Sequence, residues 1–471
     1  MARRLHIASK VSMVQSNSQP LMSTKSIANN ALLSMAIRIS LVIVATSLLS
    51  YWHLVAQLQA SISDQLALFV SERAQVENQW LGYLDQKLLK IRQDYIERYQ
   101  RLQGQEPSGQ FDRFFKMNAD GSAYVRSEYF SGTPDAVGKQ HKGYSGGMDK
   151  VQPFTPERRL QLILSMDMLF DYGPAMVQPA TATDPALTPF VNLYFFLKEK
   201  DLLVYWPNLA WYPDYQNNFD LAEQGDFKKT FNMQLPMDKR ERLWTATYLD
   251  EVAKVWMTSY TMPIDLNGKN IGALGADISL ADLNSRLQKN KFTGASNLIM
   301  RADGQLIADP TREQALIQAK GAFNLATNGD ASLQALYRLI REHPGQSVID
   351  DKVHKRLIAV GKIEATGWLF VAEYPKSLLN NAAIDTVWFI FGLGVLSLMV
   401  EVAMLWLVMQ RKVAQPLHQF LTTLQEVSRG NLGTAATAAL PLERHDEIGT
   451  LAIAFSTMVM SMITDGAGSS S

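Results

Sequence analysis

Cysteine is absent from the 471 residues, which excludes disulfides, thiolate metal sites and cysteine nucleophiles. An excess of either charge is also lacking: 45 basic and 45 acidic residues give a formal net charge of zero, so nothing points to a nucleic-acid partner. The seven histidines form no HxxxH or HExxH pair, and no glycine-rich stretch has the setting of a phosphate loop. We therefore expect no metal, no cofactor and no catalytic residues.

Long hydrophobic runs are present, in two segments at about 31–55 and 386–409. Each has the roughly 20 residues that a helix needs to cross a bilayer. A signal peptide is the alternative for the first segment, but no A-x-A-like cleavage site follows its apolar core. We interpret both segments as transmembrane helices.

The charges beside these segments predict the orientation of the chain. Residues 1–37 contain basic but no acidic side chains, and Arg411 and Lys412 close the second segment. Under the positive-inside rule both termini are cytoplasmic, and the residues between the segments lie outside the plasma (inner) membrane. Residues 1–30 are polar and rich in Ser and Asn, which predicts a disordered leader.

The region between the two apolar segments begins with a helical pattern. From 58 to about 103 the apolar residues recur at helical spacing without a proline, which predicts one helix of about 45 residues. Short strands and Gly-containing turns follow, at 192–207, 255–279, 297–307, 346–349, 356–363 and 368–374, with a helix at 281–289. The predicted fold class is α+β: two stacked lobes on one long helix, the distal lobe ending near 290 and the proximal lobe covering 291–380.

Two heptad helices follow the second apolar segment. Their apolar seams are Val413, Leu417, Phe420, Leu424 and Val427, then Ile448, Leu451, Phe455, Met458 and Met462. Neither helix buries its seam alone, so we expect two chains to form a parallel four-helix bundle, a homodimer.

Residues 410–464 resemble a HAMP domain. The resemblance depends on Pro416-Leu417, the Gly430-Asn431-Leu432 turn and the Asp446-Glu447-Ile448-Gly449 box. It implies a signal relay in which Pro416, Leu424, Glu447 and Phe455 take part. An ordinary coiled-coil linker is the alternative.

Residues 56–380 resemble a double Cache sensor, an extracytoplasmic ligand-binding module of bacterial receptors. The resemblance is most specific at Trp244–Leu283, which has an aromatic–Asp, strand, Pro-Ile, Gly-Lys, strand, Asp-Ile, helix order. The segment VYWPNLAWYPD at 204–214 resembles the one that lines the membrane-distal pocket. Residues 105–190 match poorly, and we expect them to form an inserted cap.

The resemblance implies a distal pocket lined by Tyr205, Trp211, Tyr212, Tyr248 and Asp277. In the amino-acid-binding Cache group an arginine two residues before the Trp-Tyr pair clamps the ligand carboxylate, whereas Leu209 stands here. This difference favours an amine, a purine-like molecule or another ligand without a carboxylate. Alternatively, the aromatic residues are core packing and Asp277 caps the next helix, for which Ser279 is the closer N-cap.

These observations predict a transmembrane signal-transduction receptor that relays binding of a small ligand to a cytoplasmic output or partner protein. The last residues, 465–471, are a small-residue tail, so we expect an output domain to be absent. The output domain that we expect such a receptor to have is that of a histidine kinase, a cyclase, a phosphatase or a chemoreceptor. The rival classes are a ligandless membrane adaptor and a membrane-anchored extracytoplasmic enzyme.

Overall fold

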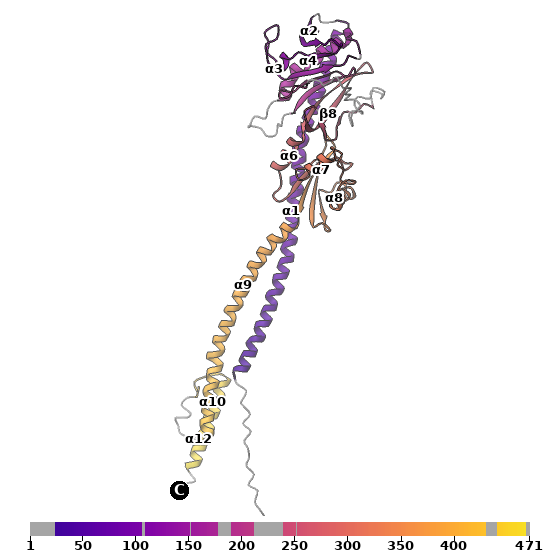
Figure 1. Cartoon of the computed structure of the whole chain (residues 1–471). Helices are drawn as coiled ribbons and strands as arrows, with labels where there is room; N and C mark the ends of the chain where they lie inside the picture. The colour runs from indigo at the N-terminus through magenta and orange to yellow at the C-terminus, as the bar shows by residue number, and fades with distance from the viewer. Residues whose placement is uncertain are drawn as a thin grey trace, which may run out of the picture. The chain divides into compact units, whose positions relative to one another are not determined.

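The computed structural model describes residues 24–105, 109–150, 152–177, 190–211, 239–250, 252–429 and 440–467 (Figure 1). It divides into two compact units. One unit is Gln57–Asn380, and the other combines the N-terminal residues up to Ala56 with those from Asn381 onward. Tyr212 and the Gly430-Asn431-Leu432 turn lie outside the described residues.

The helix α1 is continuous over 79 residues, Thr24–Leu102. The first predicted membrane segment and the predicted long helix are therefore parts of one helix. No proline occurs in α1 and no glycine precedes Gly82, so nothing in the sequence interrupts the backbone hydrogen bonds where the two segments join. Within the unit Gln57–Asn380, α1 buries one of its faces. The buried residues recur at helical spacing and are Leu66, Val70, Ala74, Leu81, Leu84, Leu88, Ile91, Tyr95 and Tyr99.

The distal sheet of this unit has nine strands in the order β1-β2-β3-β5-β4-β9-β8-β6, with β7 paired to β8. All pairs are antiparallel. The strands are β1 Phe115–Met117, β2 Ala123–Val125, β3 Tyr144–Met148, β4 Asn192–Leu197, β5 Leu202–Tyr205, β6 Leu243–Trp244, β7 Tyr248–Asp250, β8 Val255–Leu266 and β9 Lys269–Ser279. The helices are α2 Gln110–Phe114, α3 Glu128–Ser131, α4 Pro156–Met176 and α6 Leu280–Lys289.

The described part of residues 105–190, where we expect an inserted cap, extends the distal sheet. Strands β1, β2 and β3 extend the distal sheet, and α4 packs against β4 and β5. Short strands separated by glycine turns carry little periodicity, so the sequence did not reveal them. The predicted hairpin at 255–279 is confirmed: Asn267 and Gly268 both have positive φ, 52° and 76°, as a two-residue type I′ turn requires.

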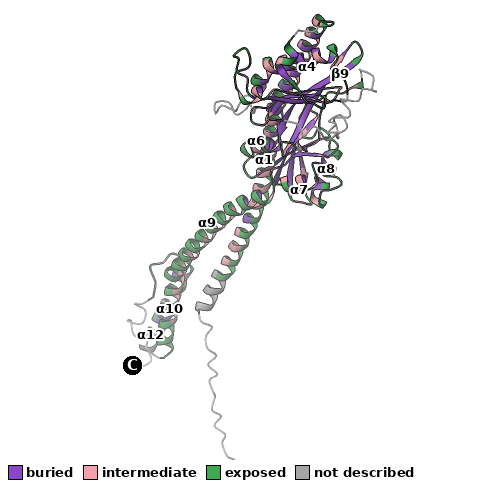
Figure 2. Ribbon diagram, turned by 45° about the horizontal axis from the view of Figure 1, so that its top comes forward, coloured by how far each residue is buried: buried purple, intermediate pink, exposed green. Residues whose placement is uncertain are grey.

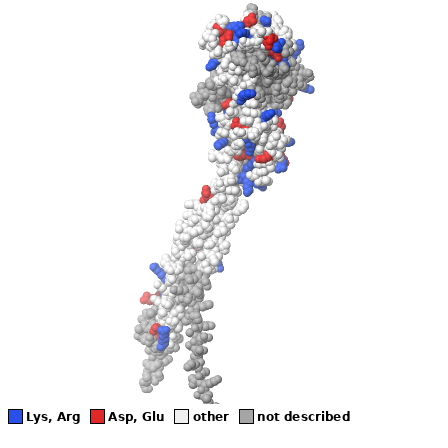
Figure 3. Space-filling view, in the orientation of Figure 1, with Lys and Arg blue, Asp and Glu red and all other residues white. Residues whose placement is uncertain are grey.

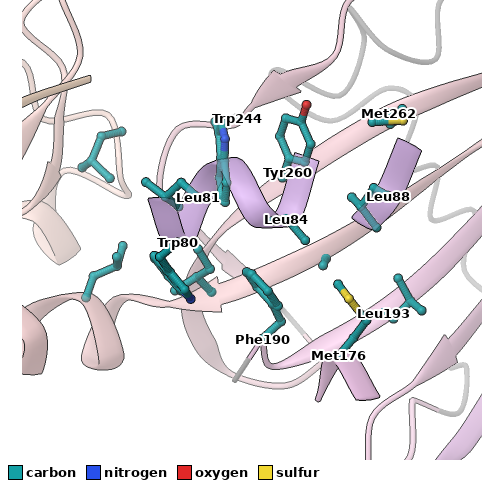
Figure 4. Packing of buried hydrophobic residues seen from close by; sticks show 14 of the residues in the cluster. Trp80, Leu81, Leu84, Leu88, Met176, Phe190, Leu193, Trp244, Tyr260 and Met262 are labelled. Carbon is teal, nitrogen blue, oxygen red and sulfur yellow. The ribbon is translucent and has the colours of Figure 1, made fainter. Parts of the chain in front are cut away.

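One face of the distal sheet packs on α1 and α4 in the main hydrophobic core (Figures 2 and 4). Figure 4 shows Leu84 and Leu88 of α1 beside Leu193 of β4 and Met262 of β8. The Trp80 and Phe190 rings stack with centroids 5.6 Å apart and planes 4° from parallel.

The proximal sheet has five strands in the order β11-β10-β14-β13-β12. They are β10 Ser296–Met300, β11 Leu306–Ala308, β12 Val348–Asp351, β13 Arg356–Ile363 and β14 Trp368–Pro375, with helices α7 Glu313–Gln318 and α8 Ala331–Glu342. These strands confirm the predicted ones to within a few residues. The unit thus contains two α+β lobes along α1.

The second unit is helical. It contains α9 (Ser377–Met409, which begins in the first unit), a π-helical turn at Gln410–Ala414, α10 (Gln415–Ser428) and α12 (Glu447–Ala467). Among the described residues two helical stretches, Leu33–Leu102 and Ser377–Ser428, contain a segment that is long and apolar enough to cross a membrane. Figure 3 shows few charged side chains on the helical unit. A Cβ on Gly394 would lie 2.8 Å from Ile43 Cγ2, so the two apolar helices approach closely there.

Candidate ligand-binding site

The second face of the distal sheet carries its own buried group of side chains, separate from the main core. We call it the distal-face cluster: Tyr194, Phe196, Leu202, Val204, Trp206, Trp211, Met257 and Ala273. Strand alternation produces the separation, because Leu193, Phe195 and Leu197 of the same strand β4 belong to the main core. A sheet face that is rich in aromatic residues and has a few polar groups is typical of small-molecule sites.

Asp277 supplies the charged group on this face. Its neighbours in register are Asn192 on β4 and Ser259 on β8, and Asn192 Nδ2 donates a hydrogen bond of 2.7 Å to Asp277 Oδ2. Asp277 Oδ1 and the Tyr194 hydroxyl have no hydrogen-bond partner among the described residues. An unsatisfied buried polar atom is costly, which makes a binding partner for Asp277 favourable.

Burial controls the protonation of Asp277, whose side chain is almost inaccessible. Burial raises the pKa of this carboxyl to about 7. The polar side chains of Ser259 and Asn192 beside it act in the opposite direction, and the charge of Asp250 adds to the increase. Near neutral pH both protonation states are therefore populated. A cationic ligand would favour the ionised state, and a ligand that accepts a hydrogen bond would favour the neutral one.

The other predicted site residues divide between the two faces. Trp211 is buried in the distal-face cluster, and its backbone N–H donates to Ser145 Oγ at 3.0 Å. Tyr248 packs at the edge of the cluster, with its hydroxyl 2.7 Å from Ser259 Oγ. Trp211, Tyr248 and Asp277 therefore occupy one face.

Tyr205 does not join them, and its predicted place in the pocket is wrong. Its ring lies in the main core, 4.7 Å from the Tyr144 ring, and a Cβ on Gly173 would collide with it at 2.7 Å. The next residue, Trp206, belongs to the distal-face cluster instead, as does Tyr194. Alternation along β5 places Leu203 and Tyr205 in the main core, and it therefore assigns Trp206 to the opposite face.

Two further observations concern the alternatives for this site. Ser279, and not Asp277, caps α6: its side chain accepts a hydrogen bond from the Asp282 N–H. Leu209 is partly buried against the distal-face cluster, so an apolar side chain occupies the position where an arginine clamp would stand. A capping role for Asp277 is therefore excluded.

The predicted relay residues lie in the helical unit. Pro416 is buried in the first turn of α10, and the rings of Phe420 and Phe455 meet edge to face at 5.2 Å. Leu424 is 39 % exposed in the single chain. At the start of α12 Asp446 accepts a hydrogen bond from the Gly449 N–H at 3.0 Å, so Asp446, and not the exposed Glu447, caps this helix.

The sequence matches two families. Residues 182–285 match the methyl-accepting chemotaxis protein-like, first PDC sensor domain. Residues 408–464 match the HAMP domain.

A curated relative and two solved structures are similar to the chain. The methyl-accepting chemotaxis protein TlpQ of Pseudomonas aeruginosa is 26 % identical over 222 residues, which cover 44 % of this chain and 30 % of the relative. The ligand-binding domain of Pseudomonas fluorescens chemoreceptor CtaA with L-isoleucine is 14 % identical, covering 47 % of this chain and 78 % of that one, with a TM-score of 0.31. The corresponding domain of the P. aeruginosa chemoreceptor PctB with L-Arg is also 14 % identical, covering 45 % and 83 %, with a TM-score of 0.31.

The chain spans less than a third of the length of the curated relative, so the match says nothing of the rest of that protein. The match to the sensor domain lies within the α+β unit, and the match to the HAMP domain lies within the helical unit. The chain therefore has the organisation of a membrane signal-transduction receptor: a ligand-binding sensor domain of the chemoreceptor PDC type, two apolar helices and a HAMP domain.

Proposed function

We propose that this chain contains the sensor and the signal relay of a two-span receptor of the plasma (inner) membrane. In this proposal residues 56–380 form an extracytoplasmic double Cache sensor, 31–55 and 386–409 cross the membrane, and 410–464 form a cytoplasmic HAMP relay. The two lobes along α1 and the HAMP match support it. The similarity to a chemotaxis protein favours a chemoreceptor output over a kinase, cyclase or phosphatase.

The ligand is proposed to be a small molecule with a cationic or hydrogen-bond-donating nitrogen, bound on the distal sheet face. Trp211, Tyr212 and Tyr248 would supply aromatic contact, joined by Tyr194 and Trp206, and Asp277 would supply the charge. The single observation that carries this proposal is the buried Asp277 carboxyl, whose Oδ1 has no hydrogen-bond partner within the part of the chain that the structure describes. Leu209 supports a ligand without an essential carboxylate, because it offers that group no partner.

The test is a thermal-shift screen of the full chain in detergent with amines, purines and amino acids. A ligand at a hundredfold its dissociation constant should add about 2.7 kcal/mol to the free energy of unfolding. Asp277→Asn should abolish most of this gain for an amine. The matched control is Asp120→Asn, the same change on an exposed turn of the same lobe, which should leave the gain intact.

Two results would contradict the ligand proposal. Stabilisation by carboxylates alone would mean that the nitrogen-donor chemistry is wrong. An Asp277→Asn variant that fails to fold, beside a well-folded Asp120→Asn variant, would mean that Asp277 is structural.

Signal relay is proposed to pass through a homodimer. In one chain the α10–α12 contact buries Pro416, Thr423, Ala452 and Val459 but leaves Leu424 exposed. Leu451 and Met458 are exposed as well, so three of the described seam residues are available for a second chain. Ligand binding would shift the second span by ~1–2 Å, and HAMP would convert this shift into a change of bundle packing.

A further inference from the structure

A cleft of about 490 Å³ opens on the sensor unit between its two sheets. Its lining comes from α1 (Asp85), from the β6–β8 edge of the distal sheet, and from the β10–β11 and β13–β14 turns of the proximal sheet. It shares no residue with the distal-face cluster or Asp277. Tyr260, which lines the cleft, is the neighbour of Ser259 on β8, so the cleft and the proposed ligand site use opposite faces of the distal sheet.

An aromatic wall forms the inside of the cleft. The Trp244 ring lies 5.0 Å from Tyr260 and 5.2 Å from Trp368 between ring centroids. All three side chains are more than nine-tenths buried, so the packing around them holds the rings in place and only a small part of each lines the cleft. Figure 4 shows Trp244 and Tyr260 side by side next to Leu81 and Leu84 of α1.

The rim of the cleft carries charged pairs that water reaches. Arg242 Nη1 lies 3.0 Å from Asp85 Oδ1, with side-chain exposures of 45 % and 32 %. On the proximal side Arg301 Nε lies 3.5 Å from Asp303 Oδ2. Ion pairs this exposed add little to stability, so a ligand can take over one partner at small cost.

Arg242 is the side chain best placed to pair with a ligand in place of Asp85. Asp85 also accepts a hydrogen bond from the Tyr260 hydroxyl, so it keeps a partner when Arg242 turns to a ligand. Burial, followed by repulsion from Arg242, lowers the pKa of Arg92, and the charges of Asp265 and Asp85 act in the opposite direction. An additional anion at Arg242 would relieve this repulsion.

We propose that this cleft is a second ligand site that binds a small carboxylate with a planar or apolar body. The carboxylate pairs with Arg242, as guanidinium groups favour, and the body lies against Trp244 and Trp368. Because the cleft joins both lobes to α1, its ligand stabilises one arrangement of the sensor unit, independently of the distal pocket.

The test uses the full chain in lipid nanodiscs and isothermal titration calorimetry with phenylacetate. The matched probe is 2-phenylethylamine, which has the same ring and an ammonium group in place of the carboxylate. Phenylacetate should bind once per chain, and Arg242→Gln should weaken it about tenfold or more, the loss of one charge-assisted hydrogen-bonded pair. Arg242→Lys should retain part of the affinity, and Arg338→Gln, at an exposed site on α8, should change nothing.

The proposal is overturned if phenylacetate gives no saturable heat at a concentration about tenfold above a dissociation constant of ~1 mM. It is also overturned if Arg242→Gln binds phenylacetate as tightly as the wild type does. Thermal unfolding of Arg242→Gln at the wild-type temperature shows that the variant is folded. Asp277→Asn separates the two sites, because it should leave phenylacetate binding unchanged while it weakens amine binding. If Asp277→Asn loses phenylacetate binding and Arg242→Gln keeps it, the carboxylate binds in the distal pocket and this inference is contradicted.

Discussion

At the scale of single residues, the Asp277 carboxyl has the clearest physical signature in the sensor unit. Its pKa is raised by burial from 3.8 to about 7, so the folded chain holds a proton that the unfolded chain releases near pH 4. The stability that this group contributes is present below pH 4 and is lost as the pH rises through about 7. The full shift corresponds to roughly 4 kcal/mol.

We predict that Asp277→Asn gains stability relative to the wild type as the pH rises from 4 to 8. The asparagine does not ionise, so it avoids the cost of a buried charge. Thermal unfolding at a series of pH values measures the difference. A constant difference across this range would show that Asp277 titrates normally and is not desolvated.

The same titration predicts the pH dependence of ligand binding. An ammonium ligand needs the ionised Asp277, so its affinity should rise up to about tenfold per pH unit below pH 7 and level off above it. Calorimetric titrations of an amine between pH 5.5 and 8.5 test this. An affinity that falls with rising pH would indicate a ligand that uses the neutral carboxyl instead.

At the scale of secondary-structure elements, an ion-pair group links α6 to α1. Arg286 on α6 donates to Glu77 on α1 at 2.9 Å, and Arg73 binds the other oxygen of Glu77. The Arg286 guanidinium also lies 4.3 Å from the centre of the Trp80 ring. Since α6 directly follows β9, which carries Asp277, this group connects the candidate site to α1, the helix that also contains the first apolar segment.

We predict that Arg286→Gln destabilises the chain by about 3–5 kcal/mol, because it leaves Glu77 buried with only one of its two arginines. Adding Glu77→Gln should recover part of this loss, since the double variant buries no unbalanced carboxylate. A double-mutant cycle from thermal unfolding gives the coupling. Additive effects would mean that the two side chains do not interact.

The HAMP helices allow a second test at this scale. We predict that Leu424→Asp weakens the dimer by several kcal/mol and leaves the fold of the single chain intact, because Leu424 is exposed until a second chain covers it. Disulfide crosslinking between chains, through cysteines added near 424, should fall. Gln425→Asp, one position away and also exposed, should crosslink as the parent does. Equal crosslinking in both variants would show that the seam is not a bundle core.

At the scale of the whole molecule, both ends of the chain are predicted to lie in the cytoplasm. Reporter fusions at residues 20 and 420 should both give cytoplasmic signals, because positive charge flanks both apolar segments on those sides. A fusion at residue 150 should give an extracytoplasmic signal. An extracytoplasmic signal at 20 or 420 would contradict the two-span arrangement.

The sequence alone determined the order of the elements. Apolar runs of membrane length, helical spacing up to Leu102, the Asn267-Gly268 turn and the heptad seams are local patterns, so each was predictable from neighbouring residues. Asp277 became a candidate through the resemblance to the double Cache sensor, which rests on the Asp-Ile pair at the end of the second strand of the hairpin.

Which side chains meet depends on how the elements pack in three dimensions. Tyr205 and Trp206 are consecutive and both aromatic, yet they face opposite sides of the sheet, and a shift of one residue in register would exchange them. Strands β1 to β3 join the distal sheet through pairings between distant segments, which local patterns do not encode. The cleft beside Arg242 likewise forms from residues 85 to 368, brought together only when both sheets pack along α1.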